Sequence, residues 1–255
     1  MDRIPFNLAL YDTLLARGLT TGMGNSDTRV CVEHAVALAC GYGPTDSPRC
    51  VAAADRDFAI WLNDAQWADP GERAAALRDL GILGLDTRGT DRLPWARRVV
   101  DGAVRKVLPE LMRSYAEVAV DPGLFPVLQT SAKAVEEAEP EGLLKALEDI
   151  AMVLASGAWW NLHYAVTSLK NAVADIRAAD RASKDQDPST RDPLDTYICE
   201  THAVSATCYA ARAWHAKDHP WGAGPLKGMV AVAVEAYAAE GRTVESVLAQ
   251  CEVAS

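Results

Sequence analysis

Between Leu143 and Ile176, an apolar side chain recurs at every third or fourth position without a break. The series consists of Leu143, Leu147, Ile150, Leu154, Ala158, Leu162, Val166, Leu169, Val173 and Ile176. This spacing puts all of these side chains on one face of an α-helix, whereas the faces of a β-strand alternate with a period of two. The series therefore predicts one long central helix that begins after Glu139-Pro140-Glu141. A helix of ~40 residues would span roughly 60 Å, so we expect a bend near Gly157.

The other segments carry the start and stop signals of further helices. Gly18 and Gly41 follow apolar segments as C-terminal stops, and Asp69-Pro70-Gly71-Glu72 is a capping box that contains a proline. Ser47-Pro48 is a similar start and predicts a helix that runs to about Asn63. Alanine, the best helix former, is the commonest residue, and no segment shows the clean alternation of a strand.

The sequence therefore predicts an all-α bundle of about nine helices with a long central helix. Pro109 predicts a kink or a break in a helix that starts at Asp91. Residues 183–193 form the most polar stretch and are the best candidate for a mobile loop or linker. We expect a single domain over residues 1–255, and the alternative is a division at this loop.

Composition excludes several classes of protein. With 49 % hydrophobic and 24 % charged residues among 255, the chain can bury a sizeable core and is not a disordered protein. Its 25 Lys and Arg against 35 Asp and Glu give a net charge of −10. Because neutralising phosphates requires clustered basic residues, we expect no binding to duplex DNA.

Features of the sequence also favour a cytoplasmic protein that does not span a membrane. The first residues lack the basic and apolar regions of a secretory signal, and the six cysteines are dilute, which favours free thiols in a reducing compartment. Residues 150–169 are uncharged and long enough to cross a bilayer. They include several polar side chains, so a helix buried in the bundle is the preferred interpretation.

Two segments share the pattern Cys-x-x-His-Ala-Val-x-x-x-Cys. The first contains Cys31 and His34, and the second contains Cys199 and His202. Cysteine and histidine three residues apart share a helix face, and two such pairs would supply the Cys₂His₂ set of a structural zinc site. The plainer interpretation is that these cysteines pack as small buried side chains and that the protein has no cofactor.

Cys31 also raises the hypothesis of a reactive thiol. It lies in the first turn of its predicted helix, where the helix dipole stabilises a thiolate, and His34 could pair with it. The alternative is an inert cysteine. The signatures of cysteine hydrolases, di-iron bundles, zinc proteases, P-loop and dinucleotide-binding enzymes and α/β-hydrolases are absent from the sequence.

A group of aromatic residues offers a possible ligand site. Its members are Trp159, Trp160, His163, Tyr164 and Trp221. Aromatic rings with a polar atom line many ligand pockets, but they also dominate hydrophobic cores, and core packing is the preferred interpretation.

Residues 17–67 contain a set of short segments that form a recognisable pattern. They are Arg17-Gly18-Leu19, Cys31-Val32-Glu33-His34-Ala35-Val36, Gly41, Asp46-Ser47-Pro48-Arg49-Cys50-Val51 and Leu62-Asn63-Asp64. These segments resemble a family of uncharacterised bacterial and phage-borne helical proteins, whose pattern is roughly Cys-Ile/Val-Glu-Ala-Ala-Val, a glycine, and then Asp-x-Pro-x-Cys-Val. The resemblance implies no reaction, but it implicates Glu33, Asp46 and Cys50. His34 stands where the pattern has alanine, which argues against the zinc and Cys31–His34 hypotheses.

Two classes of function follow. The first is a non-catalytic protein that binds an unidentified protein or small molecule, in a phage- or defence-related setting. The second is an enzyme that uses Glu33, Asp46 and a cysteine such as Cys31, with Glu33 as a general base. A buried Glu33 could instead bond to the backbone and serve the fold. A deep polar pocket around Glu33 and Asp46 would favour the enzyme, and a packed Glu33 with an exposed apolar patch would favour the binding protein.

Overall fold

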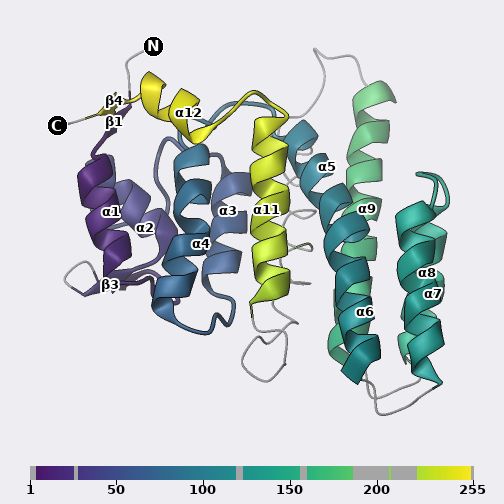
Figure 1. Ribbon diagram of the computed structural model, residues 1–255. Helices are drawn as coiled ribbons and strands as arrows, with labels where there is room; N and C mark the ends of the chain where they lie inside the picture. Colours follow the sequence, from purple (N-terminus) through teal and green to yellow (C-terminus); the bar gives the residue numbers. More distant parts are fainter. Residues whose placement is uncertain are drawn as a thin grey trace.

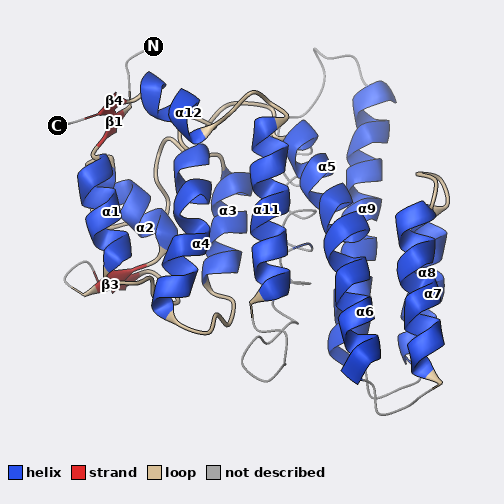
Figure 2. Ribbon diagram, in the orientation of Figure 1, coloured by secondary structure: helices blue, strands red, loops and turns tan. Residues whose placement is uncertain are grey.

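The computed structural model describes residues 4–25, 28–118, 123–155, 160–185, 207 and 223–253. Within these residues the regular secondary structure is almost entirely helical, which confirms the predicted all-α class, and the expected number of about nine helices is close (Figure 2). None of the described helices is long and apolar enough to cross a bilayer. Of residues 150–169, which raised that question, residues 150–155 end one helix and residues 160–169 begin another.

The helices form two groups that lie on either side of one late helix. The first group comprises α1 (Leu8–Ala16), α2 (Val32–Ala39), α3 (Ala53–Asn63) and α4 (Pro70–Leu83). The second comprises α5 (Leu93–Gly102), the π-helix η1 (Ala103–Val107), α6 (Leu108–Val118), α7 (Leu124–Glu137), α8 (Leu143–Ala155) and α9 (Trp160–Asp185). Near the C-terminus, α11 (Gly224–Ala238) packs against both α4 and α5, and α12 (Val244–Gln250) packs against α4 (Figure 1). One continuous cluster of buried apolar side chains extends from Phe6 to Cys251.

Two pairs of short strands complete the first group. Strand β1 (Pro5–Phe6) pairs in parallel with β4 (Glu252–Val253), so the first and last described segments of the chain lie side by side (Figure 1). Strand β2 (Gly24–Asn25) pairs with β3 (Arg29–Val30) in an antiparallel hairpin that precedes α2. The sequence did not predict these strands, because two residues are too few to show an alternating pattern.

The sequence located some helix starts correctly and one wrongly. Asp69 accepts hydrogen bonds from the N–H groups of Gly71 (2.7 Å) and Glu72 (2.9 Å) and caps α4 as predicted. The predicted start at Ser47 is wrong, since α3 begins at Ala53. The Cys50 carbonyl accepts hydrogen bonds from two N–H groups of the 84–90 loop, so its segment cannot continue a helix ladder.

The predicted continuous helix over the apolar series is wrong, because the chain reverses within it. Helix α8 ends at Ala155, α9 begins at Trp160, and the two helices pack against each other. His163 Nδ1 lies 2.9 Å from the carbonyl oxygen of Ala151, a contact that a straight helix, with a rise of roughly 18 Å over this separation, could not make. The two halves of the apolar series lie on α8 and α9, which pack against each other, and Leu147 and Leu169 are fully buried. Helix α9, with 26 residues, is the longest helix described.

Pro109 does not stop the helix that surrounds it. The π-helical turn η1 immediately precedes α6, and Pro109 is the second residue of α6. Because proline has no N–H to donate to the preceding turn, a locally widened turn lets the chain continue past it. The predicted loop at 183–193 lies largely outside the described residues, and α9 continues to Asp185.

Candidate functional site

Helix α2 carries most of the residues that the sequence singled out. Cys31 is its N-cap, Glu33 and His34 lie in its first turn, and Cys40 is its C-cap. Seven of its eight residues are buried, because α1, α3 and α4 surround it. A helix covered on this many sides buries its polar side chains too, and their environment then decides their chemistry.

Glu33 is packed inside the protein. Its side chain is 2 % exposed, and Oε2 has no hydrogen-bond partner among the described residues. Burial raises the pKa of Glu33 well above its usual value, and the nearby Cys50 and Asp55 raise it further. The charge of Arg56 lowers the pKa of Glu33, but burial outweighs it. The protonated form of Glu33 is therefore favoured, and in this form the carboxyl donates a proton rather than accepts one.

Asp46 is half-buried in the loop between α2 and α3. Its negative charge contributes to raising the pKa of both Glu33 and Cys31, which places it in their neighbourhood. The fold thus brings Glu33, Asp46 and Cys50, the three positions that the family resemblance implicated, into the surroundings of α2.

The surroundings of Cys31 favour the protonated thiol and not the thiolate that a reactive cysteine requires. Burial raises its pKa to about 12, although backbone N–H groups at the start of α2 act in the other direction. Its sulfur accepts a hydrogen bond from the backbone N–H of His34 (3.4 Å). The His34 ring instead places Nδ1 3.0 Å from the Met23 carbonyl oxygen. Cys31 is therefore a protonated capping residue, because burial outweighs the helix dipole.

The structure describes only two of the four residues of the predicted zinc site, because Cys199 and His202 lie outside the described residues. Among the residues that are described, no group of three or more histidine, cysteine, aspartate or glutamate side chains could hold a metal ion. His34 does have one property of a zinc ligand. Its Nδ1 is anchored on a carbonyl, while Nε2 is buried and has no partner in the described part of the chain.

The aromatic group is also described only in part. Trp159 and Trp221 lie outside the described residues, and only the backbone of Trp160 is described. His163 contacts the Ala151 carbonyl and joins α8 to α9, while Tyr164 is 50 % exposed. These two residues contribute to a helix hairpin and to the surface, respectively.

A pair of thiols that the residue patterns did not predict lies at the other end of α2. The Sγ atoms of Cys40 and Cys50 are 3.9 Å apart. Hydrogen bonds from Cys40, Tyr42 and the backbone N–H of Asp86 lower the pKa of Cys50 against the effect of burial. The Cys40 thiol, which donates to Cys50 and is buried, has a raised pKa. The sequence signal that could have predicted this pair is the turn rich in glycine and proline that separates Cys40 from Cys50.

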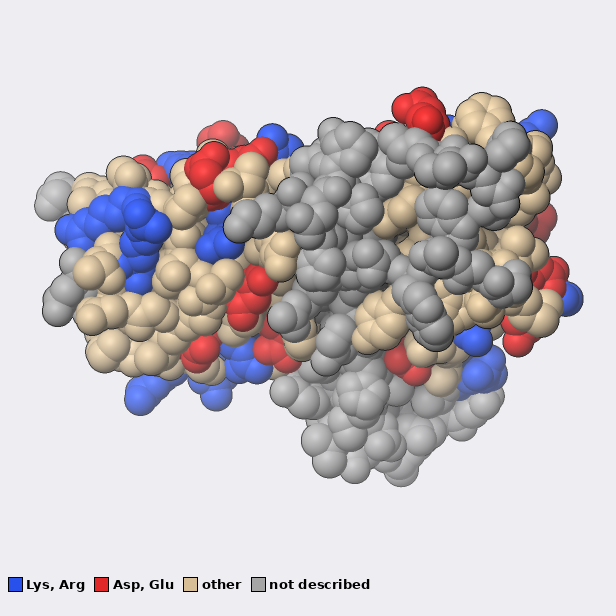
Figure 3. Space-filling view, turned by 90° about the horizontal axis from the view of Figure 1, so that it is seen from below, with Lys and Arg blue, Asp and Glu red and all other residues tan. Residues whose placement is uncertain are grey.

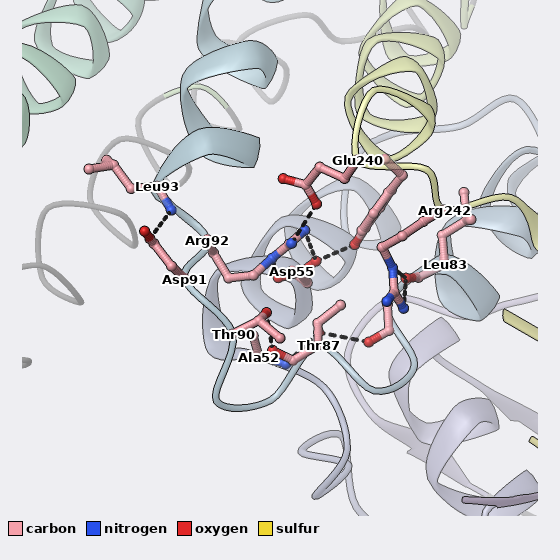
Figure 4. Close-up of polar contacts among 12 residues, drawn as sticks. Ala52, Asp55, Leu83, Thr87, Thr90, Asp91, Arg92, Leu93, Glu240 and Arg242 are labelled. Atoms are coloured by element: carbon pink, nitrogen blue, oxygen red, sulfur yellow. Dashed lines mark hydrogen bonds and ion pairs between the residues drawn. The ribbon is translucent and has the colours of Figure 1, made fainter. Parts of the chain in front are cut away.

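A buried ion network joins the two groups of helices (Figure 4). Arg92 donates two hydrogen bonds of 2.8 Å to the carboxylate of Asp55 and a third of 2.8 Å to Glu240. The Tyr237 hydroxyl also donates to Asp55, and the Arg92 guanidinium lies 5.0 Å from the ring centre of Trp95. Burial alone would lower the pKa of Arg92, but Asp55 outweighs this and raises it, so Arg92 stays charged. Sequence spacing gave no sign of this network.

An apolar groove of about 320 Å³ lies on the surface between α4 and α11. It is lined by Glu72, Ala75, Ala76, Lys227, Val230, Ala231 and Val234. Ala75 and Ala231 are exposed, while Ala76 and Val234 are half-buried. Lys227 and Glu72 form an ion pair of 2.7 Å at its edge. The groove is thus an uncharged strip of small side chains with a neutral edge.

Basic and acidic side chains are interspersed on the described part of the face in Figure 3. The ion pairs among the described residues include Arg113–Glu136, Lys106–Glu235 and Lys227–Glu72.

Comparisons of the chain with protein-family models, with curated proteins and with solved structures find no match.

Proposed function

We propose that this protein is a non-catalytic interaction protein, and that the groove between α4 and α11 receives a helical segment of a partner protein. The observation that carries the proposal is the apolar strip between two helices, in which Ala75 and Ala231 are exposed and Ala76 and Val234 are half-buried. A partner helix that lays aliphatic side chains into a groove is a common mode of recognition. Alanines on both walls allow such a helix to approach closely.

The charges around the groove define the chemistry of the partner. Glu72 is paired with Lys227, and Glu235, farther along α11, is paired with Lys106. Because these charges compensate each other, they exert little long-range attraction on a charged partner. We therefore expect the bound segment to be uncharged along its buried face, with small and medium aliphatic residues at helical spacing.

The state of the buried acids also favours binding over catalysis. Glu33 is packed and burial raises its pKa, and Asp55 is held in an ion network by Arg92 and Tyr237. Asp55 thus serves the fold, as buried polar groups usually do. The resemblance of residues 17–67 to phage-borne proteins favours a phage- or defence-related setting for the partner.

Site-specific photo-crosslinking tests the proposal in the native cells. A photoreactive residue at position 231 should give a discrete adduct with one protein, and the same residue at exposed Ala155, at the end of α8, should not. The identified partner is then purified and its affinity measured by calorimetry. We expect Ala231→Glu to weaken binding at least about tenfold, or 1.4 kcal/mol, since it buries an unpaired charge.

Ala155→Glu is the matched control, because it adds the same charge at an exposed alanine outside the groove. It should leave the affinity unchanged. Equal loss in both variants, or full affinity of Ala231→Glu, would rule out the groove as the binding surface.

A further inference from the structure

Cys40 and Cys50 are anchored on different elements and face each other across a loop. The backbone N–H of Cys40 donates to the Val36 carbonyl and closes α2, while the Cys50 carbonyl accepts from the N–H groups of Thr87 and Arg88. Residues 41–49 form the loop that connects Cys40 to Cys50 along the chain. Their Sγ atoms are nevertheless 3.9 Å apart. The proposed binding function makes no use of this arrangement.

The two thiols have unequal surroundings. The Cys50 sulfur receives hydrogen bonds from the Cys40 thiol, the Tyr42 hydroxyl and a backbone N–H of Asp86. Three donors stabilise a thiolate, which is the nucleophilic form of cysteine. Tyr42 remains a donor at neutral pH because burial and the neighbouring thiols raise its pKa to about 12. Cys50 therefore has the environment of an attacking thiol, and Cys40 has that of a resolving thiol.

The loop over the pair leaves room for the movement that bonding requires. Gly41 and Gly43 adopt positive φ angles of 73° and 81°, and a side chain at either position would meet open space. Tyr42, between them, is half-buried. The two sulfur atoms must approach from 3.9 Å to about 2.05 Å. A surface loop with two glycines can accommodate this shift while both anchored ends stay in place.

We propose that Cys40 and Cys50 form a redox-active dithiol that a hydroperoxide oxidises to an intramolecular disulfide. The Cys50 thiolate attacks the outer oxygen of the hydroperoxide, the O–O bond breaks, and a proton completes the leaving alcohol or water. This step leaves a sulfenic acid on Cys50. The Cys40 sulfur then attacks the Cys50 sulfur, forms the S–S bond and releases water that carries the Cys40 proton. Two thiols lose two electrons in total, and the hydroperoxide gains them.

Peptide mapping of the full-length protein tests this proposal. The reduced protein is treated with hydrogen peroxide, its remaining thiols are alkylated, and it is digested with trypsin. Cleavage after Arg29, Arg49 and Arg56 puts Cys40 and Cys50 on separate peptides, residues 30–49 and 50–56. We expect these two peptides to become linked, with fragmentation locating the bond at Cys40. Cys31, on the first peptide, should be alkylated at the same peroxide dose.

Two variants separate the roles of the thiols. Cys40→Ser should accumulate a sulfenic acid on Cys50 that dimedone traps, about tenfold faster than it labels Cys31. Cys251→Ser is the matched control, since Cys251 is a buried thiol close enough to Cys50 for its pKa to be raised by it. It should still form the disulfide at the wild-type rate. A linkage to another cysteine, or equal labelling of Cys31 and Cys50, would overturn the proposal.

Discussion

The helices on the two sides of α11 are held together by different kinds of contact. In the first group, buried polar side chains bind specific backbone atoms: Asn63 accepts from Val32 N–H (3.2 Å) and donates to the Thr20 carbonyl (2.7 Å), and Arg73 donates to the Leu19 carbonyl (3.1 Å). In the second group, α7 to α9 bury apolar stripes, and ion pairs such as Lys133–Glu137 remain exposed.

This difference shows where chemistry can arise in the molecule. A buried polar atom depends on its partner and its pKa responds to its surroundings, whereas an exposed ion pair is screened by water. Glu33, Cys50 and Asp55, three buried groups with shifted pKa values, accordingly lie in the first group. Substitutions in each group, and at their contacts with α11, test this contrast.

The largest effect is expected for Arg92→Ala. This substitution leaves the Asp55 carboxylate buried without its positive partner, which typically costs about 3–5 kcal/mol of the free energy of unfolding. Urea denaturation followed by circular dichroism measures this loss. A loss below about 1 kcal/mol, the range of exposed pairs, would remove the distinction between the two groups.

Glu33→Gln should change how stability depends on pH. The raised pKa of Glu33 means that the folded state keeps a proton that the unfolded state releases above its ordinary pKa near 4.5. The protonated Glu33 therefore makes its full contribution to the free energy of unfolding below that pH, and this contribution is lost as the pH rises toward the pKa of Glu33 in the folded state. In this window the wild type should lose about 1.4 kcal/mol per pH unit relative to Glu33→Gln.

The measurement is urea denaturation of both proteins between pH 4 and pH 8. Parallel curves would mean that Glu33 is ionised in the fold. That outcome would restore the general-base hypothesis and weaken the proposal of a non-catalytic protein.

Gly102→Ala tests the contact between the second group and α11. A Cβ atom at this position would lie 2.5 Å from Cγ1 of Val232, a stiff β-branched side chain. We expect the overpacking to cost about 1–3 kcal/mol, measured by thermal unfolding. Gly224→Ala is a suitable control, because a Cβ atom there would meet open space.

The smallest effect is expected for Arg113→Ala in the second group. Its ion pair with Glu136 is more than one-third exposed on the arginine side, so its removal should cost about 0–1 kcal/mol. The same denaturation experiment as for Arg92→Ala gives the comparison. A loss of unfolding free energy as large as that of Arg92→Ala would show that exposed ion pairs stabilise this protein as strongly as the buried network does.

The residue patterns anticipated part of the candidate site. They identified Cys31, Glu33 and His34 as belonging to one helix, and the family resemblance added Asp46 and Cys50. They could not assign protonation states, since the helix position of Cys31 favours a thiolate while burial raises its pKa to about 12. The Cys40–Cys50 contact and the α4–α11 groove were not predicted, because they depend on how distant segments pack.

The sequence alone determined the all-α class and several helix ends. The three-to-four spacing of apolar residues fixes helical structure, and caps such as Asp69 and Thr243 act within a few residues of themselves. Only the tertiary structure decided that the apolar series is divided between α8 and α9, which pack against each other, and that Asp55 meets Tyr237, 182 residues later. Local spacing determines which side chains share a face, but desolvation and the choice of partner depend on which faces pack together.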